Sequence, residues 1–262
     1  MNWGDGTSDN ITSANDPALT HDYGVTGSYD VTIQGDCVGF SCLSGSDRDK
    51  IIDILQWGTS VRFNDVIGSF LGISATNISA SDIPVINGDV SDFFRGCGFL
   101  VSVNNIENWD MSNVTNMSGM FRQTFLFDEN IGDWDVSNIT SFFNMFANAS
   151  NFNNGGSSTI NNWNVSNMVL SRNMFDGATS FNQNIGSWDV TSLSIANNML
   201  DDSNLSVANY DSLLIGWESQ NVLNNVDFGA DNIDYSAGGA AETARNALIN
   251  DHIWEIIDGN AV

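Results

Sequence analysis

Residues 134–146 read Trp-Asp-Val-Ser-Asn-Ile-Thr-Ser-Phe-Phe-Asn-Met-Phe, and this stretch recurs along the chain. The tryptophans of the recurring unit are separated by 25, 29 and 25 residues, and a Met-Phe or Met-Leu pair keeps the same spacing. Two independent markers in one register indicate an internal repeat. The four extra residues of the longer interval lie in Asn-Gly-Gly-Ser-Ser at 154–158, the kind of insertion that stacked units tolerate.

Within one unit, Ile131, Trp134 and Val136 have the spacing of a leucine-rich-repeat strand, and Thr140 is placed to cap a short helical turn. A single unit cannot bury its own tryptophan, methionine and phenylalanine, so we expect the units to stack with their strands paired. The sequence therefore predicts an α/β repeat: a leucine-rich-repeat-like right-handed solenoid with a parallel β-sheet, an N-terminal β cap and a C-terminal α/β cap.

The large apolar residues of the units are predicted to form the buried core and not a cofactor site. They are Trp109, Trp134, Trp163, Trp188, Met120, Phe121, Met145, Phe146, Met174 and Phe175. An asparagine recurs after each predicted strand, at Asn113, Asn138 and Asn167. We expect it to be buried at the bend and to satisfy backbone groups of neighbouring units.

The two ends of the chain differ from the units, as expected for caps that cover an otherwise open core. We predict a β cap over residues 1–46, the solenoid over 47–204 with clear repeats at about 90–200, and an α/β cap over 205–262. In the last region, Ser206 is the expected N-cap of a helix reaching Trp217, residues 242–250 form another helix, and residues 254–258 close the final sheet edge.

Charge excludes several classes of partner. The chain has 262 residues, 7 lysines and arginines against 32 acidic residues, and a formal charge of -25. A surface with so few cations repels nucleic acid and anionic lipid. No apolar stretch approaches 18 residues, so no membrane insertion is predicted. The N-terminus lacks a secretion signal pattern, so we expect either that a signal was removed or that the protein needs none, as in a virion released by lysis.

Cysteine and histidine are sparse. Cys37 and Cys42 are close enough in sequence to form a disulfide, which leaves Cys97 over. His21 and His252 fall in the two predicted caps, and no cysteine has a histidine nearby in sequence. No nucleophile, phosphate-loop or dinucleotide pattern stands out, so the sequence predicts a protein that is not an enzyme and has no cofactor.

Two side chains of each predicted strand point outward beside the buried tryptophan. They form a candidate ligand-facing ladder of Asn108, Asp110, Asp133, Asp135, Asn162, Asn164, Ser187 and Asp189. Calcium prefers such oxygen ligands, so we keep it as a candidate ion without assigning a metal site. The alternative, which we favour for the aspartates, is that each bonds backbone at its own bend. For Asp5, in Trp-Gly-Asp-Gly-Thr, we likewise favour a turn over a metal ligand.

The units resemble a known family. Residues 109–121, Trp-Asp-Met-Ser-Asn-Val-Thr-Asn-Met-Ser-Gly-Met-Phe, are similar to the repeat of BspA-like leucine-rich-repeat surface proteins, as are residues 175–190. Trp-Gly-Asp-Gly-Thr at 3–7, with residues 20–23 and 27–33, resembles part of a PKD-like β-sandwich. The first resemblance implies a cell-surface or secreted protein that adheres to another surface and carries no shared catalytic activity.

We therefore expect a non-enzymatic extracellular or cell-surface protein for adhesion or recognition that binds a protein or a glycan. The alternative is a phage or virus virion component, with a structural, decorating or receptor-binding role, whose partners are other virion proteins. A third hypothesis is a structural spacer within a large adhesin, with no ligand of its own. Ice or mineral binding by the polar ladders is a weaker fourth.

Overall fold

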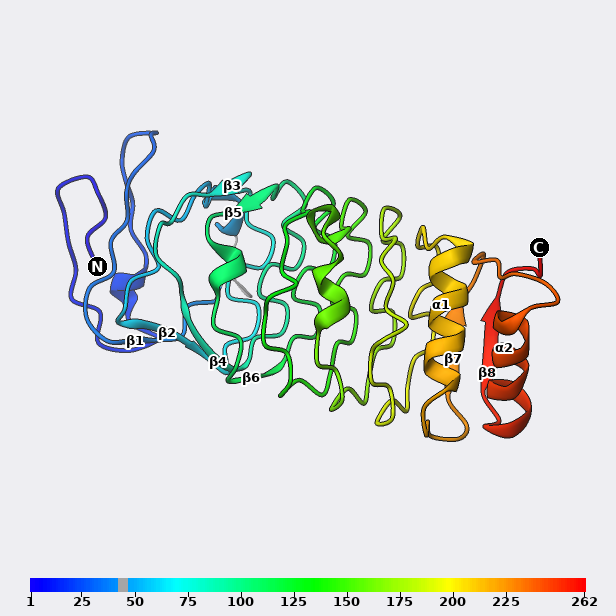
Figure 1. Cartoon of the computed structure of the whole chain (residues 1–262). Coiled ribbons are helices and arrows are strands. Elements are labelled where there is room, and N and C mark those ends of the chain that lie inside the picture. The colour runs from blue at the N-terminus through cyan, green and yellow to red at the C-terminus, as the bar shows by residue number, and fades with distance from the viewer. Residues whose placement is uncertain (42–46) are drawn as a thin grey trace.

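A computed structural model describes residues 1–41 and 47–262 (Figure 1). Successive units lie side by side from the N-terminal to the C-terminal end of the molecule. The strands are β1 (Cys37–Val38), β2 (Val61–Asn64), β3 (Asn77–Ile78), β4 (Val85–Asp89), β5 (Ser102–Val103), β6 (Val114–Asn116), β7 (Asp227–Ala230) and β8 (Glu255–Asp258). The α-helices are α1 (Val207–Glu218) and α2 (Ala240–Asp251), and short 3₁₀ helices are η1 (Pro17–Leu19), η2 (Arg48–Lys50), η3 (Ile106–Asn108), η4 (Asn154–Gly156) and η5 (Ser158–Asn162).

The predicted leucine-rich-repeat-like right-handed solenoid is wrong. The described residues contain two α-helices and three small, separate parallel sheets, with strand orders β1-β2-β4-β6, β3-β5 and β7-β8. Between β6 and β7 the described units form no strand ladder, and their β-pairing consists of isolated parallel bridges. These join Asn116 to Ser141, Ser141 to Leu170, Leu170 to Ile195, and Ala196 to Phe228. One continuous parallel sheet is therefore absent from the described residues.

The strands were expected in the wrong part of each unit. The segment containing Trp134 and Val136 forms no strand, and the parallel bridge of this unit comes later, at Ser141. The equivalent Trp109 has φ -65° and ψ 131°, and Trp163 has φ -57° and ψ 126°. These angles are close to polyproline II, which is extended but has no strand partner. Alternating burial in such a segment looks like a β-strand in the sequence.

The helical turn that was predicted to contain each Met-Phe pair is also replaced, by a turn with left-handed residues. Two left-handed residues, each with φ between 53° and 74°, flank this pair in every unit. The first set is Gly68, Asp92, Gly119, Asn144, Asn173 and Asn198, and the second is Gly72, Gly96, Gln123, Asn148, Gly177 and Asp202. Left-handed residues cannot continue a right-handed helix, and glycine and asparagine adopt this conformation most readily.

The turns redirect backbone hydrogen bonds from within a unit to the next unit. The N–H of Phe94 donates to Met120 O at 2.9 Å, Phe121 to Met145 O at 2.9 Å, Phe146 to Met174 O at 2.8 Å, and Phe175 to Met199 O at 2.8 Å. In the unit of Phe121, Gly119 and Gln123 donate to the next unit in the same way, at 2.8 and 2.9 Å. Parallel hydrogen bonds of this kind hold neighbouring units together.

The core lies inside this stack. Every predicted core side chain is buried, with at most 3% of its surface exposed. The rings of Phe121 and Phe146 stack with centroids 5.6 Å apart, and those of Phe146 and Phe175 with centroids 5.5 Å apart. Trp163 and Trp188 stack at 6.1 Å. Because each ring packs against the ring of the next unit, each unit depends on its neighbours for burial.

A second polar ladder runs from the units into α1. Asn153 N–H donates to Asp128 Oδ1 at 2.7 Å, Asn182 N–H to Asn153 Oδ1 at 2.9 Å, and Ser206 N–H to Asn182 Oδ1 at 2.9 Å. Ser206 then caps α1 through its side chain, which accepts from the backbone of Asn209. The predicted N-cap is confirmed, and the ladder explains how the helix is seated on the last unit.

The C-terminal helices and the closing strand are confirmed as elements. α2 covers the predicted 242–250, and β8 pairs in parallel with β7 along Asp227–Ala230. Asp258, whose side chain is 2% exposed, accepts two hydrogen bonds from Arg245, at 2.7 and 2.6 Å. Tyr210 of α1 donates to the same carboxylate at 2.8 Å. This buried network ties α1, α2 and β8 together.

The N-terminal β cap is not observed. Residues 1–41 contain β1, η1 and isolated antiparallel bridges of Asn2 with Ser8 and Thr32. No PKD-like sandwich is present in these described residues. In residues 47–57 the structure has the short 3₁₀ helix η2. The predicted disulfide of Cys37 cannot be placed, since Cys42 lies outside the described residues.

No described helix is long and apolar enough to cross a membrane.

Candidate recognition surface

The residue before each unit tryptophan is exposed. These residues, which we name the outer row, are Asn108, Asp133, Asn162 and Ser187. The neighbouring tryptophans are buried because the extended segment places successive side chains on opposite sides. Four consecutive units therefore present one short polar side chain each at equivalent positions.

Two of the four outer-row side chains are available for a ligand without loss of an internal hydrogen bond. Within the described part of the chain, Asp133 and Asn162 make no side-chain hydrogen bond or ion pair. Asn108 donates to Glu107 Oε1 at 3.0 Å, and the Ser187 hydroxyl donates to Asn161 O at 3.1 Å. A partner that reaches Asp133 or Asn162 thus has no internal hydrogen bond to displace.

The residues after the tryptophans have a different role. This turn row consists of Asp110, Asp135, Asn164 and Asp189, all exposed. Each accepts two hydrogen bonds from the serine or threonine two residues later. Asp135 Oδ1, for example, accepts from the Ser137 backbone N–H at 3.0 Å and from its hydroxyl at 2.6 Å. These are Asx turns, so each turn-row side chain stabilises its own bend.

Electrostatics agree with this difference. The pKa of Asp135 is lowered, first by the hydrogen bond from the Ser137 hydroxyl and then by the bond from the Ser137 backbone. A carboxylate held in its charged form by two donors is satisfied without a cation. In the turn row, the structure thus matches the alternative in which each aspartate bonds at its own bend.

The recurring asparagines are exposed and not buried as predicted. Asn138 Nδ2 donates to Ser112 O of the preceding unit at 2.7 Å, and Asn167 Nδ2 donates to Ser137 O at 2.8 Å. They do satisfy backbone carbonyls of a neighbouring unit, but at the surface. The extended segment brings the bend to solvent, which the strand interpretation did not allow.

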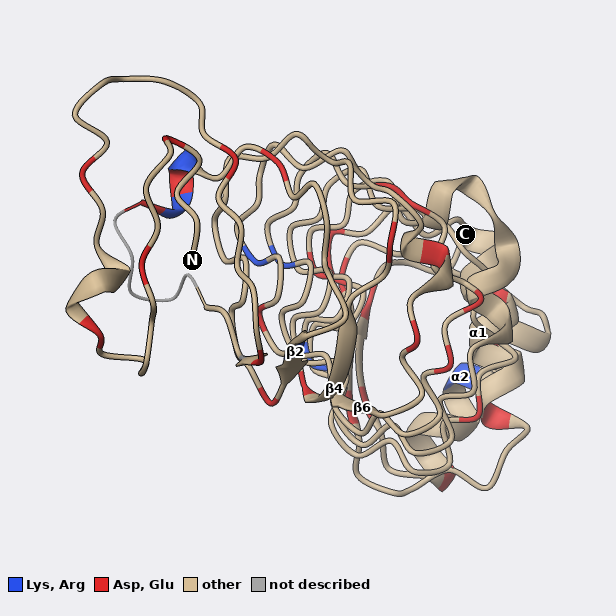
Figure 2. Ribbon diagram, turned by 90° about the vertical axis from the view of Figure 1, so that its left-hand side faces the viewer, with Lys and Arg blue, Asp and Glu red and all other residues tan. Residues whose placement is uncertain are grey.

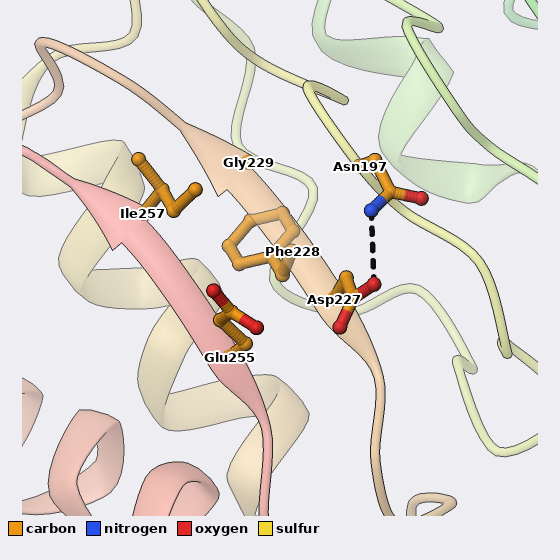
Figure 3. Close-up of a pocket in the computed structure, with 6 residues that line it drawn as sticks. All are labelled: Asn197, Asp227, Phe228, Gly229, Glu255 and Ile257. Carbon is orange, nitrogen blue, oxygen red and sulfur yellow. Dashed lines mark hydrogen bonds between the residues drawn. The ribbon is translucent and has the colours of Figure 1, made fainter.

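A shallow pocket that the sequence analysis missed lies at the β7–β8 sheet (Figure 3). Asp227 and Glu255 are register partners on the two strands, and Asn197 Nδ2 donates to Asp227 Oδ2 at 3.1 Å. The volume is about 90 Å³, which holds only a few waters. In the sequence, an acidic residue on each of two paired strands would have indicated this pocket. Residues 227–230 lack the alternation of apolar and polar residues that would have predicted the strand.

The described residues hold few groupings suited to metal or acid–base chemistry. They include no group of three or more histidine, cysteine, aspartate or glutamate side chains that could hold a metal ion. Asp5 accepts from the Thr7 hydroxyl at 2.6 Å and from the Thr7 backbone at 2.9 Å, and lies 2.8 Å from His21 Nε2. The Thr7 hydroxyl, then the Thr7 backbone and His21, lower the pKa of Asp5 to about 2. Asp5 thus forms a turn.

Acidic residues are spread along the molecule, and basic ones are few (Figure 2).

Residues 88–224 match the family model described as "Mycoplasma protein of unknown function, DUF285". The chain belongs to this family. The DUF285 match covers just over half of the chain and includes the whole outer row and turn row. The family is associated with surface proteins, which is loosely compatible with a role at a surface. No curated protein and no solved structure matches the chain.

Proposed function

We propose that this DUF285 protein is a non-enzymatic recognition module at an extracellular or cell surface. In this proposal it is an adhesion protein of BspA-like type that binds a protein or a glycan through the outer row. The observation that carries the proposal is the contrast between the two rows. Turn-row side chains are engaged in their own bends, whereas Asp133 and Asn162 are exposed at equivalent positions without an internal partner.

The backbone of this surface adds to its binding capacity. Within the described residues, the amides of Asp135, Asn164 and Asp189 donate no hydrogen bond. A ligand can use these N–H groups together with the outer-row carboxylate and amides, which suits hydroxyl-rich or peptide partners. Repetition over four units allows several weak contacts to act at once.

The proposal is tested with a glycan array and with calorimetry on any glycan that binds. The double variant Asp133→Ala/Asn162→Ala should lose about tenfold or more in affinity. The control Asn250→Ala/Asp251→Ala removes the same kinds of exposed side chain at the end of α2. Equal binding by the two double variants would contradict the outer row as the site.

Calcium is tested in the same calorimeter. If the ion joins ligand and outer row, ligand affinity falls on chelation and is restored by calcium, and the Asp133→Ala variant removes this dependence. If affinity is unchanged by chelation, the outer row acts without calcium.

A further inference from the structure

Large apolar side chains are exposed together at one corner of the stack. Phe99 is 65% exposed, Val101 42%, Phe125 47% and Leu126 41%. We name these four residues the corner patch. Single exposed apolar residues are ordinary, but a contiguous group on a soluble surface marks an interaction site. The corner patch shares no residue with the outer row.

The four residues belong to two neighbouring units, and Phe125 lies beside the chain segment that carries Phe99. A Cβ atom placed on Gly98 would be 3.0 Å from Cδ2 of Phe125. The Phe125 ring therefore rests over Gly98, directly beside Phe99 in the chain. A Cβ atom at position 98 would force this ring to shift by a few tenths of an ångström, so the glycine lets the ring lie directly against the chain beside Phe99.

The core does not require these side chains. Leu100 and Phe127, which follow the exposed residues, fill the core and are fully buried. In the later units, the places equivalent to Phe125 and Leu126 are Ser150 and Asn151, and then Thr179 and Ser180. The fold thus accepts polar residues at this corner, and its apolar character has no structural cause within the described part of the chain.

Acidic groups border the corner patch. Asp128 is exposed two residues after Leu126, and Glu129 follows it. Glu129 lies close to Glu107 and Asp128: burial, and then these two neighbouring carboxylates, raise its pKa. The chain as a whole has a charge of -25. A partner is therefore attracted when it brings positive charge to this corner.

We propose that the corner patch docks a basic segment of a partner protein, in which aliphatic or aromatic side chains stand between lysines or arginines. Apolar contact with Phe99 and Phe125 supplies the affinity, and the surrounding carboxylates supply orientation and a fast encounter. A second copy of this chain is disfavoured, because its own -25 charge would be repelled. A glycan is disfavoured because the four side chains of the corner patch carry no group that can donate or accept a hydrogen bond.

The probe is a short synthetic peptide with a Phe-Leu pair flanked by lysines, measured by calorimetry against the full chain. One control peptide replaces Phe-Leu by Ser-Ser, and the other replaces lysine by glutamate. The variant Phe99→Ser/Phe125→Ser leaves the charges intact. The matched variant Val25→Ser/Leu223→Ser removes exposed apolar side chains elsewhere. Thermal melting should show all variants folded, because every changed residue is at the surface.

We expect the first peptide to bind wild type and the Val25→Ser/Leu223→Ser variant equally. Affinity should fall about tenfold or more for Phe99→Ser/Phe125→Ser and for either control peptide. Unchanged affinity of Phe99→Ser/Phe125→Ser would overturn the proposal. So would self-association, or glycan binding, that depends on Phe99 and Phe125. Loss of glycan binding in the outer-row variant bears only on the outer row, so the two proposals fail separately.

Discussion

At the scale of single residues, the tryptophans of successive units differ in one hydrogen bond. The Trp134 indole N–H donates to Ile106 O of the preceding unit at 2.7 Å, and Trp188 donates to Ile160 O at 3.0 Å. Trp109 is equally buried, yet its indole N–H has no acceptor among the described residues. The first clear unit thus carries an unsatisfied donor, which costs stability.

This difference predicts unequal effects of the same substitution. Both Trp134→Phe and Trp109→Phe lose part of a buried ring. Only Trp134→Phe also removes an indole hydrogen bond, and Ile106 O then keeps only the bond from the Trp109 backbone at 3.2 Å. Trp109→Phe removes a donor that was already unsatisfied. We expect the free energy of unfolding to fall by about 1 kcal/mol more for Trp134→Phe, measured by urea denaturation. Equal losses would show that the indole hydrogen bond contributes nothing.

At the scale of the elements, breaking the buried ion pair between α2 and β8 tests whether this network stabilises the C-terminal region. Asp258→Asn would leave Arg245 and Tyr210 facing a neutral group that cannot accept all their hydrogen bonds. Breaking a buried pair by removing one partner costs about 3 kcal/mol or more. The exposed Asp251→Asn should be almost neutral. If the two variants unfold at the same urea concentration, the network does not stabilise the C-terminal region.

How far the sequence predicted these elements depended on the kind of signal. Helix α1 was predictable, because Ser206 is a strong N-cap before an amphipathic run. The core was also predictable, since Trp134 and Phe146 recur with unit spacing. The hydrogen-bonding pattern was not, because burial alternates in a polyproline II segment as it does in a strand. A usable signal for the turns existed: a residue that tolerates positive φ, such as Gly119 or Asn144, precedes each Met-Phe pair.

For the surface, the sequence identified exposed positions but not their roles. Asp133 and Asp135 differ only in the serine that follows Asp135 by two residues, which makes the Asx turn. The pocket at Asp227 and Glu255 depends on pairing between β7 and β8, and the corner patch depends on contacts between units. Neither is visible in the pattern of one unit.

At the scale of the whole molecule, charge makes stability depend on pH. Burial raises the pKa of Asp176, and the neighbouring charges of Asp201 and Asp202 raise it further. Burial also raises the pKa of Asp201. There a hydrogen bond from the Asp231 backbone opposes the rise, and the charges of Asp231 and Asp202 add to it. A raised carboxylate pKa means that the folded state holds protons more tightly than the unfolded chain. Stability from these groups is therefore greatest below the unfolded pKa of about 4 and declines as pH rises through the folded value.

We therefore expect Asp176→Asn to be more stable than wild type at pH 7 and to gain less when the pH is lowered to 5. Thermal melting between pH 5 and 7.5 measures both effects, with Asp133→Asn as an exposed control. A lower melting temperature for Asp176→Asn at pH 7, with the slope of wild type, would contradict this account. Carboxylates with lowered pKa, such as Asp135, act in the opposite sense and only below pH of about 4.

The central claim is that amide bonds between turns hold the units together and leave the outer-row segments free of backbone pairing. Residue-resolved amide hydrogen exchange tests it most directly. The amides of Phe121, Phe146 and Phe175 should exchange slowly, and those of Asp135, Asn164 and Asp189 rapidly. Slow exchange at Asp135, Asn164 and Asp189 with rapid exchange at the three phenylalanines would mean that the strands lie in the tryptophan segments, and would contradict both the fold and the proposed surface.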